Sequence, residues 1–304
     1  MNLSWLDDFA ALAASGNFSR AAEDRHMTQP AFSRRIRALE EWLGVDLFDR
    51  SSQPAQLTDA GHWFRQVAQD LQSDVARIPG EARAVAEASS TTLRFASTHA
   101  LSFTFMPRWL RALEAQTAVG PIQLDSDTQQ KCEALLLQSK AQFMVAHGHA
   151  NVRGPLDEAG CPSLVVGQDR LVPVSAPDST GRPAHPLLPN GKGGSAHLLN
   201  YSAESGRGRI LRELKGPALD RLHAPNVLTA HLASVLRTMA LDGRGLAWLP
   251  QMLVGEDLES GRLVPAADDE WSIDLEVRLY RDRVALGKAA EAFWLAAKMG
   301  AKTS

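Results

Sequence analysis

The sequence predicts an α/β protein made of a small helical N-terminal unit, a long helix and a larger domain of alternating strands and helices. Three observations lead to this prediction. Short amphipathic segments joined by turns fill the chain before residue 45, apolar residues recur in steps of three and four from residue 64, and strand-like and helix-like segments alternate after residue 89. A length of 304 residues exceeds one ordinary core, so two or three domains are expected.

The N-terminal unit is expected to hold three short helices. The first covers residues 3–15, where apolar side chains recur at helical spacing until a turn interrupts them. Ser19 is expected to cap the second helix. Thr28 is expected to cap the third, which carries Pro30 in its first turn and ends at Gly44. Three short helices joined by tight turns predict a helix-turn-helix.

A hairpin and a long helix are expected next. Residues 45–48 and 56–57 flank a polar run and predict a small β-hairpin, or wing, after which Thr58 caps a helix. Pro79-Gly80 is expected to kink or end that helix. A heptad-like apolar seam on this helix predicts that two copies of the chain pair through it, and the alternative is that the helix packs on its own domain. The seam consists of Phe64, Val67, Leu71, Val75, Ile78, Ala82 and Val85.

The remaining sequence has the rhythm of an α/β sheet. A loop rich in Pro and Gly is expected at residues 177–194. The strand-like segments are residues 93–97, 122–124, 142–146, 164–166, 170–175, 198–201, 245–248 and 274–280. The helix-like segments are residues 103–113, 129–137, 206–214, 229–241 and 286–299. Strands that alternate with helices predict an α/β fold.

Composition narrows the class of protein. No uncharged apolar stretch of about 18 residues is present, so no membrane span is predicted. The first ten residues lack a basic segment, which argues against a signal peptide and for the cytoplasm. Cys132 and Cys161 are too few for a disulfide framework and are expected to be reduced structural thiols. The net charge of −3 does not argue against nucleic-acid binding, because a small DNA-binding domain can be joined to a large neutral domain.

The third helix has a polar face suited to DNA. With Phe32 and Ile36 facing inward, Arg34 and Arg37 point the opposite way and Ser33 lies on the flank. Arginine matches guanine edges or binds phosphate, and Gln29, at the start of the same helix, can pair with adenine. The alternative is a solvated basic face with no ligand.

Four ungapped segments of the first 65 residues carry a closer resemblance. They are residues 17–22 (NFSRAA), 28–40 (TQPAFSRRIRALE), 44–50 (GVDLFDR) and 57–61 (LTDAG). This pattern closely resembles the signature of the LysR family of transcriptional regulators. The resemblance implies a winged helix-turn-helix whose third helix enters the major groove, with Arg50 and the wing along the DNA backbone. The DNA-contacting residues expected from this are Ser19, Arg20, Thr28, Gln29, Pro30, Ser33, Arg34, Arg37 and Arg50.

The resemblance also implies the organisation of the whole chain. Residues 1–58 form the DNA-binding domain, residues 59–88 a linker and dimerisation helix, and residues 89–304 an effector-binding domain with the two-lobed fold of periplasmic binding proteins. Lobe 1 is expected at about 89–162 and 269–304, and lobe 2 at about 163–268. The expected partners are double-stranded DNA with a dyad operator, a small-molecule effector and further copies of the chain in a homodimer or homotetramer. RNA polymerase is a further candidate partner. No cofactor is expected.

Four C-terminal segments resemble the hypochlorite-responsive branch of the family: residues 199–202 (LNYS), 240–243 (ALDG), 246–250 (LAWLP) and 260–264 (SGRLV). Methionine oxidation is a candidate signal there. Because Arg207 and not a methionine follows the strand that ends at Tyr201, no redox switch is carried over.

The effector is expected between the two lobes, at strand ends and helix N-termini, where free N–H groups favour anions. Plain N-capping by the Ser and Thr residues is the alternative at each position. A small polar or anionic molecule is expected, held by hydroxyl and imidazole groups, with Arg207 and His231 adding positive potential. The expected effector-binding residues are Thr98, His99, Ser102, Thr128, His147, Ser202, Ser205, Arg207, Thr229 and His231.

Three signals for other chemistry are weak. The pair His147 and His149 lacks further ligands at metal-binding spacing, so no metal is predicted. The glycine-rich residues 191–195 lack the spacing of a phosphate loop. Ser97, Ser202 and His99 lack a nucleophile elbow. A DNA-binding regulator that is not an enzyme is therefore predicted, and a solute-binding or enzymatic α/β protein with incidental N-terminal helices is the alternative.

Overall fold

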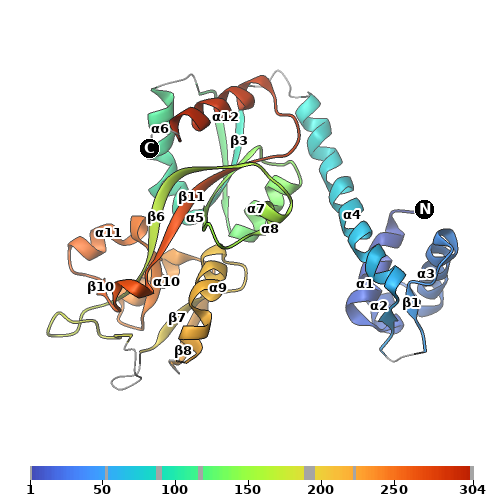
Figure 1. The fold of residues 1–304 in the computed structure, drawn as a ribbon, viewed down its shortest axis with the longest axis horizontal. Helices are drawn as coiled ribbons and strands as arrows, with labels where there is room; N and C mark the ends of the chain where they lie inside the picture. Colours follow the sequence, from blue (N-terminus) through green and yellow to red (C-terminus); the bar gives the residue numbers. More distant parts are fainter. Residues whose placement is uncertain are drawn as a thin grey trace. The chain divides into compact units, whose positions relative to one another are not determined.

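The computed structural model describes residues 2–51, 54–86, 91–115, 119–187, 196–221 and 224–301. The chain divides into two compact parts, an N-terminal unit of Met1–Ile78 and a C-terminal unit of Pro79–Ser304 (Figure 1). None of the helices in the described ranges has both the length and the apolar composition needed to span a membrane.

The N-terminal unit is a helix-turn-helix with a short wing, as predicted. Its core joins all three short helices to the wing and the start of α4, through Leu6, Phe9, Phe32, Ile36 and Phe64. Burial of these side chains is the main source of its stability. Its elements are α1 (Ser4–Ser15), α2 (Phe18–Asp24), α3 (Gln29–Leu43), the antiparallel strands β1 (Phe48–Asp49) and β2 (Gln56–Leu57), and the first part of α4 (Asp59–Ala86).

The helix ends mostly follow the predicted capping chemistry. Gly44 ends α3 in the left-handed region, with φ of 76°. Thr58 Oγ1 accepts from the Gly61 N–H at 3.0 Å and so caps α4. The prediction that Ser19 caps α2 is wrong, because Asn17 Oδ1 accepts from the N–H groups of Ser19 and Arg20 at 2.9 and 3.1 Å. Thr28 occupies the cap position of α3, but its side chain makes no capping hydrogen bond.

Helix α4 differs from the prediction in two ways. Of the two effects predicted for Pro79-Gly80, a kink or an end, the end is not observed, because the helix continues to Ala86 although proline removes one backbone hydrogen bond. The first half of the predicted seam packs on the unit's own core: Phe64 is buried, and Val67 and Leu71 lie against the same cluster. Further along, Val75 and Ile78 are exposed. The side chain of Val85 lies outside the described residues.

The C-terminal unit is an α/β domain with two lobes. Its strands are β3 (Leu93–Thr98), β4 (Ile122–Asp127), β5 (Phe143–Gly148), β6 (Ser163–Ser175), β7 (Leu198–Tyr201), β8 (Asn226–Ala230), β9 (Ala247–Pro250), β10 (Val264–Pro265) and β11 (Ile273–Arg281). Its helices are α5 (His99–Thr104), α6 (Met106–Glu114), α7 (Gln129–Leu137), α8 (Pro155–Glu158), α9 (Gly206–Asp220), α10 (Ala233–Leu241), α11 (Gln251–Glu259) and α12 (Lys288–Gly300), with a 3₁₀ turn at Asp269–Trp271.

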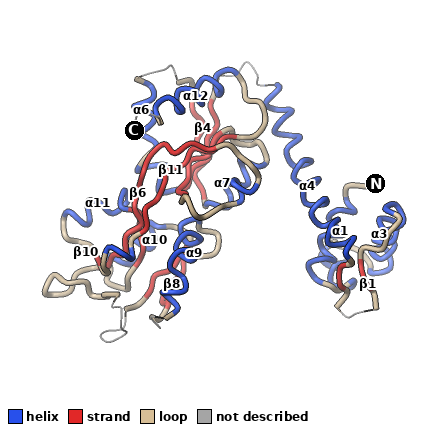
Figure 2. The backbone as a smooth tube through the Cα atoms, viewed as in Figure 1, coloured by secondary structure: helices blue, strands red, loops and turns tan. Residues whose placement is uncertain are grey.

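Strands β6 and β11 run through both lobes (Figure 2). One sheet has the order β10-β6-β11-β5-β3-β4, with β9 also paired to β6, and β7 and β8 form a separate parallel pair. On β6, Leu164 packs in the lobe 1 core with Phe95 and Phe293, whereas Leu171 packs in lobe 2 with Trp248. The division between the lobes therefore lies inside these two strands.

Several segments of the C-terminal unit differ from the sequence prediction. The two strands expected at 164–166 and 170–175 are one strand, β6, and the helix expected at 103–113 is split into α5 and α6. The helix expected at 229–241 begins only at Ala233, because residues 226–230 form β8 beside β7. Elements α8, α11 and β10 were not predicted. The glycine-rich residues 191–195 lie outside the described residues.

Both cysteines are buried as reduced thiols. Burial raises the pKa of the Cys132 thiol to about 12, which keeps that thiol protonated.

Candidate DNA interface and effector cleft

Helix α3 presents a polar face opposite its buried stripe. Phe32, Ile36 and Leu39 are fully buried, whereas Arg34 and Arg37 are exposed. Among the residues that the structure describes, Arg20, Arg34 and Arg37 take part in no ion pair. All the predicted DNA-contacting residues are exposed except Ser33, which is half-buried. Gln29 Nε2 donates to Ser33 Oγ at 3.0 Å, so these two side chains are held side by side at the start of the helix.

Two other arginines of this unit have a structural role. Asp8 is fully buried and lies 2.9 Å from Arg25 Nε and 2.7 Å from Arg35 Nε. A buried carboxylate must be paired to offset its lost hydration. The ion pairs therefore join α1 to the end of α2 and to α3, and they separate these two cations from the exposed group on the recognition face.

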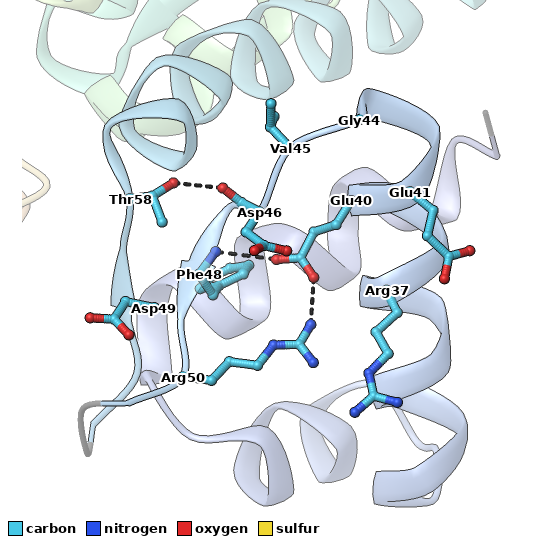
Figure 3. A pocket seen from close by; sticks show the side chains of 10 residues that line it. All are labelled: Arg37, Glu40, Glu41, Gly44, Val45, Asp46, Phe48, Asp49, Arg50 and Thr58. Atoms are coloured by element: carbon cyan, nitrogen blue, oxygen red, sulfur yellow. Dashed lines mark hydrogen bonds and ion pairs between the residues drawn. The ribbon is translucent and has the colours of Figure 1, made fainter.

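The wing is tied to α3 by Glu40 (Figure 3). Glu40 Oε1 accepts from the N–H groups of Leu47 and Phe48 at 2.9 and 3.2 Å, and its other oxygen pairs with Arg50. The Arg50 guanidinium also lies 5.6 Å from the centre of the Phe18 ring. Arg50 thus positions the wing while its side chain stays partly exposed. Glu40 was missed by the sequence analysis, although an acid on the apolar face beside Leu39 was a usable signal.

A small cavity lies where the two lobes of the C-terminal unit meet. It is lined by Thr98, His99, Asp127, Thr128, Gln129, Glu204, Ser205, Gly206, Arg207, His231 and Leu232. Six of the ten predicted effector residues are among these. The cavity volume is about 10 Å³, which is room for one water molecule, so the lobes are closed on each other.

The cleft is crossed by a buried chain of polar contacts. His147 Nε2 lies 2.9 Å from Asp169 Oδ2, and Arg207 Nη1 lies 3.3 Å from His147 Nδ1. Asp169 Oδ1 accepts from the Met252 N–H at 3.0 Å, at the start of α11. The Arg207 guanidinium also lies 5.5 Å from the centre of the Tyr201 ring. Because Arg207 is an obligate donor, His147 is neutral, with its proton on Nε2 toward Asp169.

A second arginine of α9 also reaches lobe 1. Arg209 Nη2 lies 3.2 Å from Glu133 Oε1, which Gln129 Nε2 also approaches at 2.8 Å. Gly206 makes the close approach possible, because a Cβ there would lie 2.7 Å from the Gln129 side chain. Asp169, Arg209 and Glu133 were not predicted from the sequence.

The predicted effector residues differ in their surroundings. Thr128 and Ser205 line the cavity and also cap α7 and α9 through their side chains, so the capping alternative holds for both. Ser102 Oγ contacts the His99 carbonyl at 2.7 Å and Ser126 Oγ at 3.0 Å and does not line this cavity. Thr229 lies on β8 and lines a different groove, of about 430 Å³, beside α9. The structure therefore does not bring Thr229 to the cleft.

Burial lowers the pKa of His147 below its ordinary value, against the opposing effect of its bond to Asp169. The folded protein thus binds fewer protons than the unfolded chain below about pH 6.5, and stability is lost as the pH falls. We expect the melting temperature of the C-terminal unit to fall between pH 7 and pH 5. The slope due to His147 is at most about 1.4 kcal/mol per pH unit.

Differential scanning calorimetry from pH 5 to pH 8 measures this dependence. The variant His147→Gln should show a shallower pH dependence, whereas His149→Gln, at a half-buried position two residues away, should keep the wild-type slope. Equal slopes in the wild type and His147→Gln would show that His147 is not protonated on unfolding.

Comparison with known proteins matches both parts of the chain. The family model described as bacterial regulatory helix-turn-helix protein, lysR family, matches residues 3–62, and the LysR substrate binding domain matches residues 86–301. The HTH-type transcriptional regulator YjiE of Escherichia coli (strain K12) is 32% identical over 300 residues, which cover 95% of this chain and 92% of that protein.

Solved structures agree with these matches. The full-length hypochlorite-specific LysR-type regulator HypT from Salmonella typhimurium is 28% identical, with a TM-score of 0.59 over 100% of this chain and 99% of that one. Vibrio fischeri DarR, solved in complex with DNA, is 27% identical, with a TM-score of 0.55 over 98% of each chain. The chain therefore belongs to the LysR family of transcriptional regulators, with a DNA-binding helix-turn-helix and an effector-binding domain, and is not an enzyme.

Proposed function

We propose that this regulator reads one half of a dyad operator with the exposed face of α3. The observation that carries the proposal is the group of unpaired, exposed cations on that face, Arg34 and Arg37, with Gln29 and Ser33 at the helix start. The N-terminal residues of a recognition helix contact base edges in the major groove. Ser19, Arg20, Thr28, Pro30 and Arg50 complete the proposed contact surface toward the sugar-phosphate backbone.

The substitution Arg34→Ala tests this assignment. We expect the affinity for operator DNA to fall by about 1–3 kcal/mol, or roughly 5- to 150-fold, because a charged donor to a base edge or phosphate is lost. Fluorescence anisotropy with DNA from upstream of the regulator's own gene, at fixed salt, measures the loss. Arg108→Ala, an exposed arginine on α6 of the other unit, serves as the control and should change nothing. Unchanged operator affinity in Arg34→Ala would refute the recognition-helix assignment.

Assembly of two copies is the second part of the proposal. One helix-turn-helix reads a half-site, so a two-fold dimer is needed for a dyad. The support is the second half of the α4 seam, where Val75 and Ile78 expose apolar side chains. A tetramer built from two such dimers, contact with RNA polymerase and a cytoplasmic location follow from the family resemblance alone.

The effector is the third part. We infer that a small polar or anionic molecule binds between the lobes, at the group of polar residues around Thr98, His99 and Arg207. Because the cavity is nearly closed, a larger molecule must move the lobes apart. Transmitted through α4, such a movement alters the spacing of the two DNA-binding domains of a dimer. A compound that binds only the folded form raises the melting temperature of the full-length protein, so thermal-shift screening tests this part.

We propose that the regulator senses its signal by reversible binding of a ligand and not by oxidation of a side chain. The likeness to HypT, a hypochlorite-specific regulator, supports a position near the hypochlorite-responsive branch. However, a buried arginine, Arg207, and no methionine follows the β7 strand, which disfavours methionine oxidation at that position as the switch.

A further inference from the structure

The last turns of helix α4 pack closely against a turn of lobe 1. The C-terminal unit begins at Pro79, so this part of α4 belongs to it. Gly80 is buried there, and a Cβ at this position would lie 2.4 Å from Ser139 Cβ and 2.6 Å from the Gln138 carbonyl oxygen. Any side chain larger than that of glycine would prevent so close a contact. Glycine and proline both disfavour a helix interior, so the contact with lobe 1 is what favours glycine here.

Ser139, on the other side of this contact, has a backbone conformation that suits glycine better. It follows the cap residue of α7 with φ of 52°, in the left-handed region. Its N–H donates to the Leu136 carbonyl at 3.0 Å, and the Lys140 N–H donates to the Leu135 carbonyl at 2.9 Å. Ser139 is only 4% exposed, and its Oγ has no hydrogen-bond partner among the described residues. Strain of this kind is kept where the surrounding packing requires it, and here the Ser139 Cβ fills the space beside Gly80.

Helix α7 joins this turn to the cleft between the lobes. Gln129, its first residue, and the cap residue Thr128 line the cavity. The nine residues of the helix span about 13 Å. Cys132 and Leu136 pack in one cluster with residues of β3 and β5, which holds one face of α7 on the sheet. A displacement at the cleft end of such a short, regular helix therefore also moves its other end.

Lobe 2 holds the same helix from the other side. Arg209 Nη2, on α9, lies 3.2 Å from Glu133 Oε1, and Gln129 Nε2 donates to the same oxygen at 2.8 Å. The Glu133 side chain is only 7% exposed. Because a buried carboxylate depends on its partners, the position of α7 is stabilised while the lobes are closed. When the lobes part, Glu133 loses its cation, so α7 is the helix of lobe 1 that responds to opening.

We propose that Ser139 and Gly80 are the positioning residues through which opening of the cleft moves α4. The contacts run from Arg209 to Glu133, along α7 to Ser139, and from the Ser139 Cβ to Gly80. When α7 shifts, the close contact leaves α4 no room to keep its position. This inference rests on the proposed effector site, because it gives the route by which that site acts on DNA binding.

A double-mutant cycle in the full-length protein tests this route without a ligand. Arg209→Met breaks the contact between the lobes, and Arg212→Met, on the same helix but in contact with backbone carbonyls at 3.5 Å, is its control. The measurements are hydrogen exchange of the α4 amides around Gly80 and fluorescence anisotropy with operator DNA. We expect Arg209→Met to increase this exchange and to change operator affinity about 2- to 30-fold, and Arg212→Met to change neither.

The second arm of the cycle removes the Ser139 Cβ. In Ser139→Gly, the further substitution Arg209→Met should change neither the exchange around Gly80 nor the operator affinity. The melting temperature of Ser139→Gly should equal or exceed that of the wild type, because glycine suits the left-handed region. A lost response in this variant is therefore not a loss of folding.

Gly80→Ala tests the contact from the side of α4. The added Cβ forces α4 away from Ser139, so exchange around residue 80 should rise and operator affinity should change, although alanine is the better helix former. Gly255→Ala, on α11, is the matched control. A Cβ at Gly255 meets no atom within 4 Å, so both measurements should stay at their wild-type values.

The outcomes separate the route from the effector site. Equal effects of Arg209→Met in the wild type and in Ser139→Gly overturn the route, as does wild-type exchange around residue 80 in Gly80→Ala. No effect of Arg209→Met in the wild type overturns it as well. If a compound from the thermal-shift screen changes operator affinity equally in the wild type and in Ser139→Gly, the cleft stays an effector site and only the route is wrong.

Discussion

The substitution Asp8→Asn is expected to destabilise the N-terminal unit by about 1–3 kcal/mol, because the two arginines lose the charge of their shared buried partner. Asp8 is fully buried and pairs with both Arg25 and Arg35. Without its charge, the junction of α1, α2 and α3 loses the group that holds both arginines. A loss of this size is a large fraction of the stability of a small domain.

Hydrogen exchange of residues 2–51 in the full-length protein measures this loss separately from the C-terminal unit. The neighbouring variant Asp7→Asn is the control. Asp7 is 49% exposed and contacts Arg25 at 3.2 Å, so the substitution Asp7→Asn should lower the free energy of unfolding by less than about 1 kcal/mol. Operator binding should fall with the folded fraction of the unit. Equal protection in the two variants would show that the buried pairs contribute no more than a surface contact.

The substitution Ile78→Asp is expected to separate the dimer and to lower operator affinity by about 10²- to 10⁴-fold, because each half-site is then bound independently. Ile78 is 57% exposed on α4, so a charge there should not unfold the unit. It would, however, place two carboxylates against each other in a two-fold helix pair.

Light scattering gives the mass of the particle, and anisotropy with dyad and half-site DNA gives the affinities. Leu295→Asp introduces the same charge at a residue of similar exposure, 58%, on α12, and should leave both results unchanged. A stable dimer with wild-type operator affinity would exclude the second half of the α4 seam as the contact. Leu71→Asp is a poorer test, because Leu71 packs on the core of its own unit.

The sequence by itself determined the local architecture of this protein. Spacing of apolar residues identified most of the helices, the wing, the alternation of strands and helices and the exposed face of α3, since a side chain's direction follows from helix or strand geometry over a few residues. Turn positions at strand ends identified six residues that line the cavity, because the ends of parallel strands gather at one edge of a sheet.

Only the tertiary structure decided which polar groups are buried and paired. Asp169, His147 and Arg207 come from β6, β5 and α9, and no local pattern shows that they meet. The apolar residues of the α4 seam likewise recur with a single period, yet the first half of the seam packs on the core of its own unit and the second half is exposed. Periodicity gives the direction of a side chain along its own element. Burial and charge pairing depend on what another part of the chain places against it, and the cost of desolvation follows from that packing.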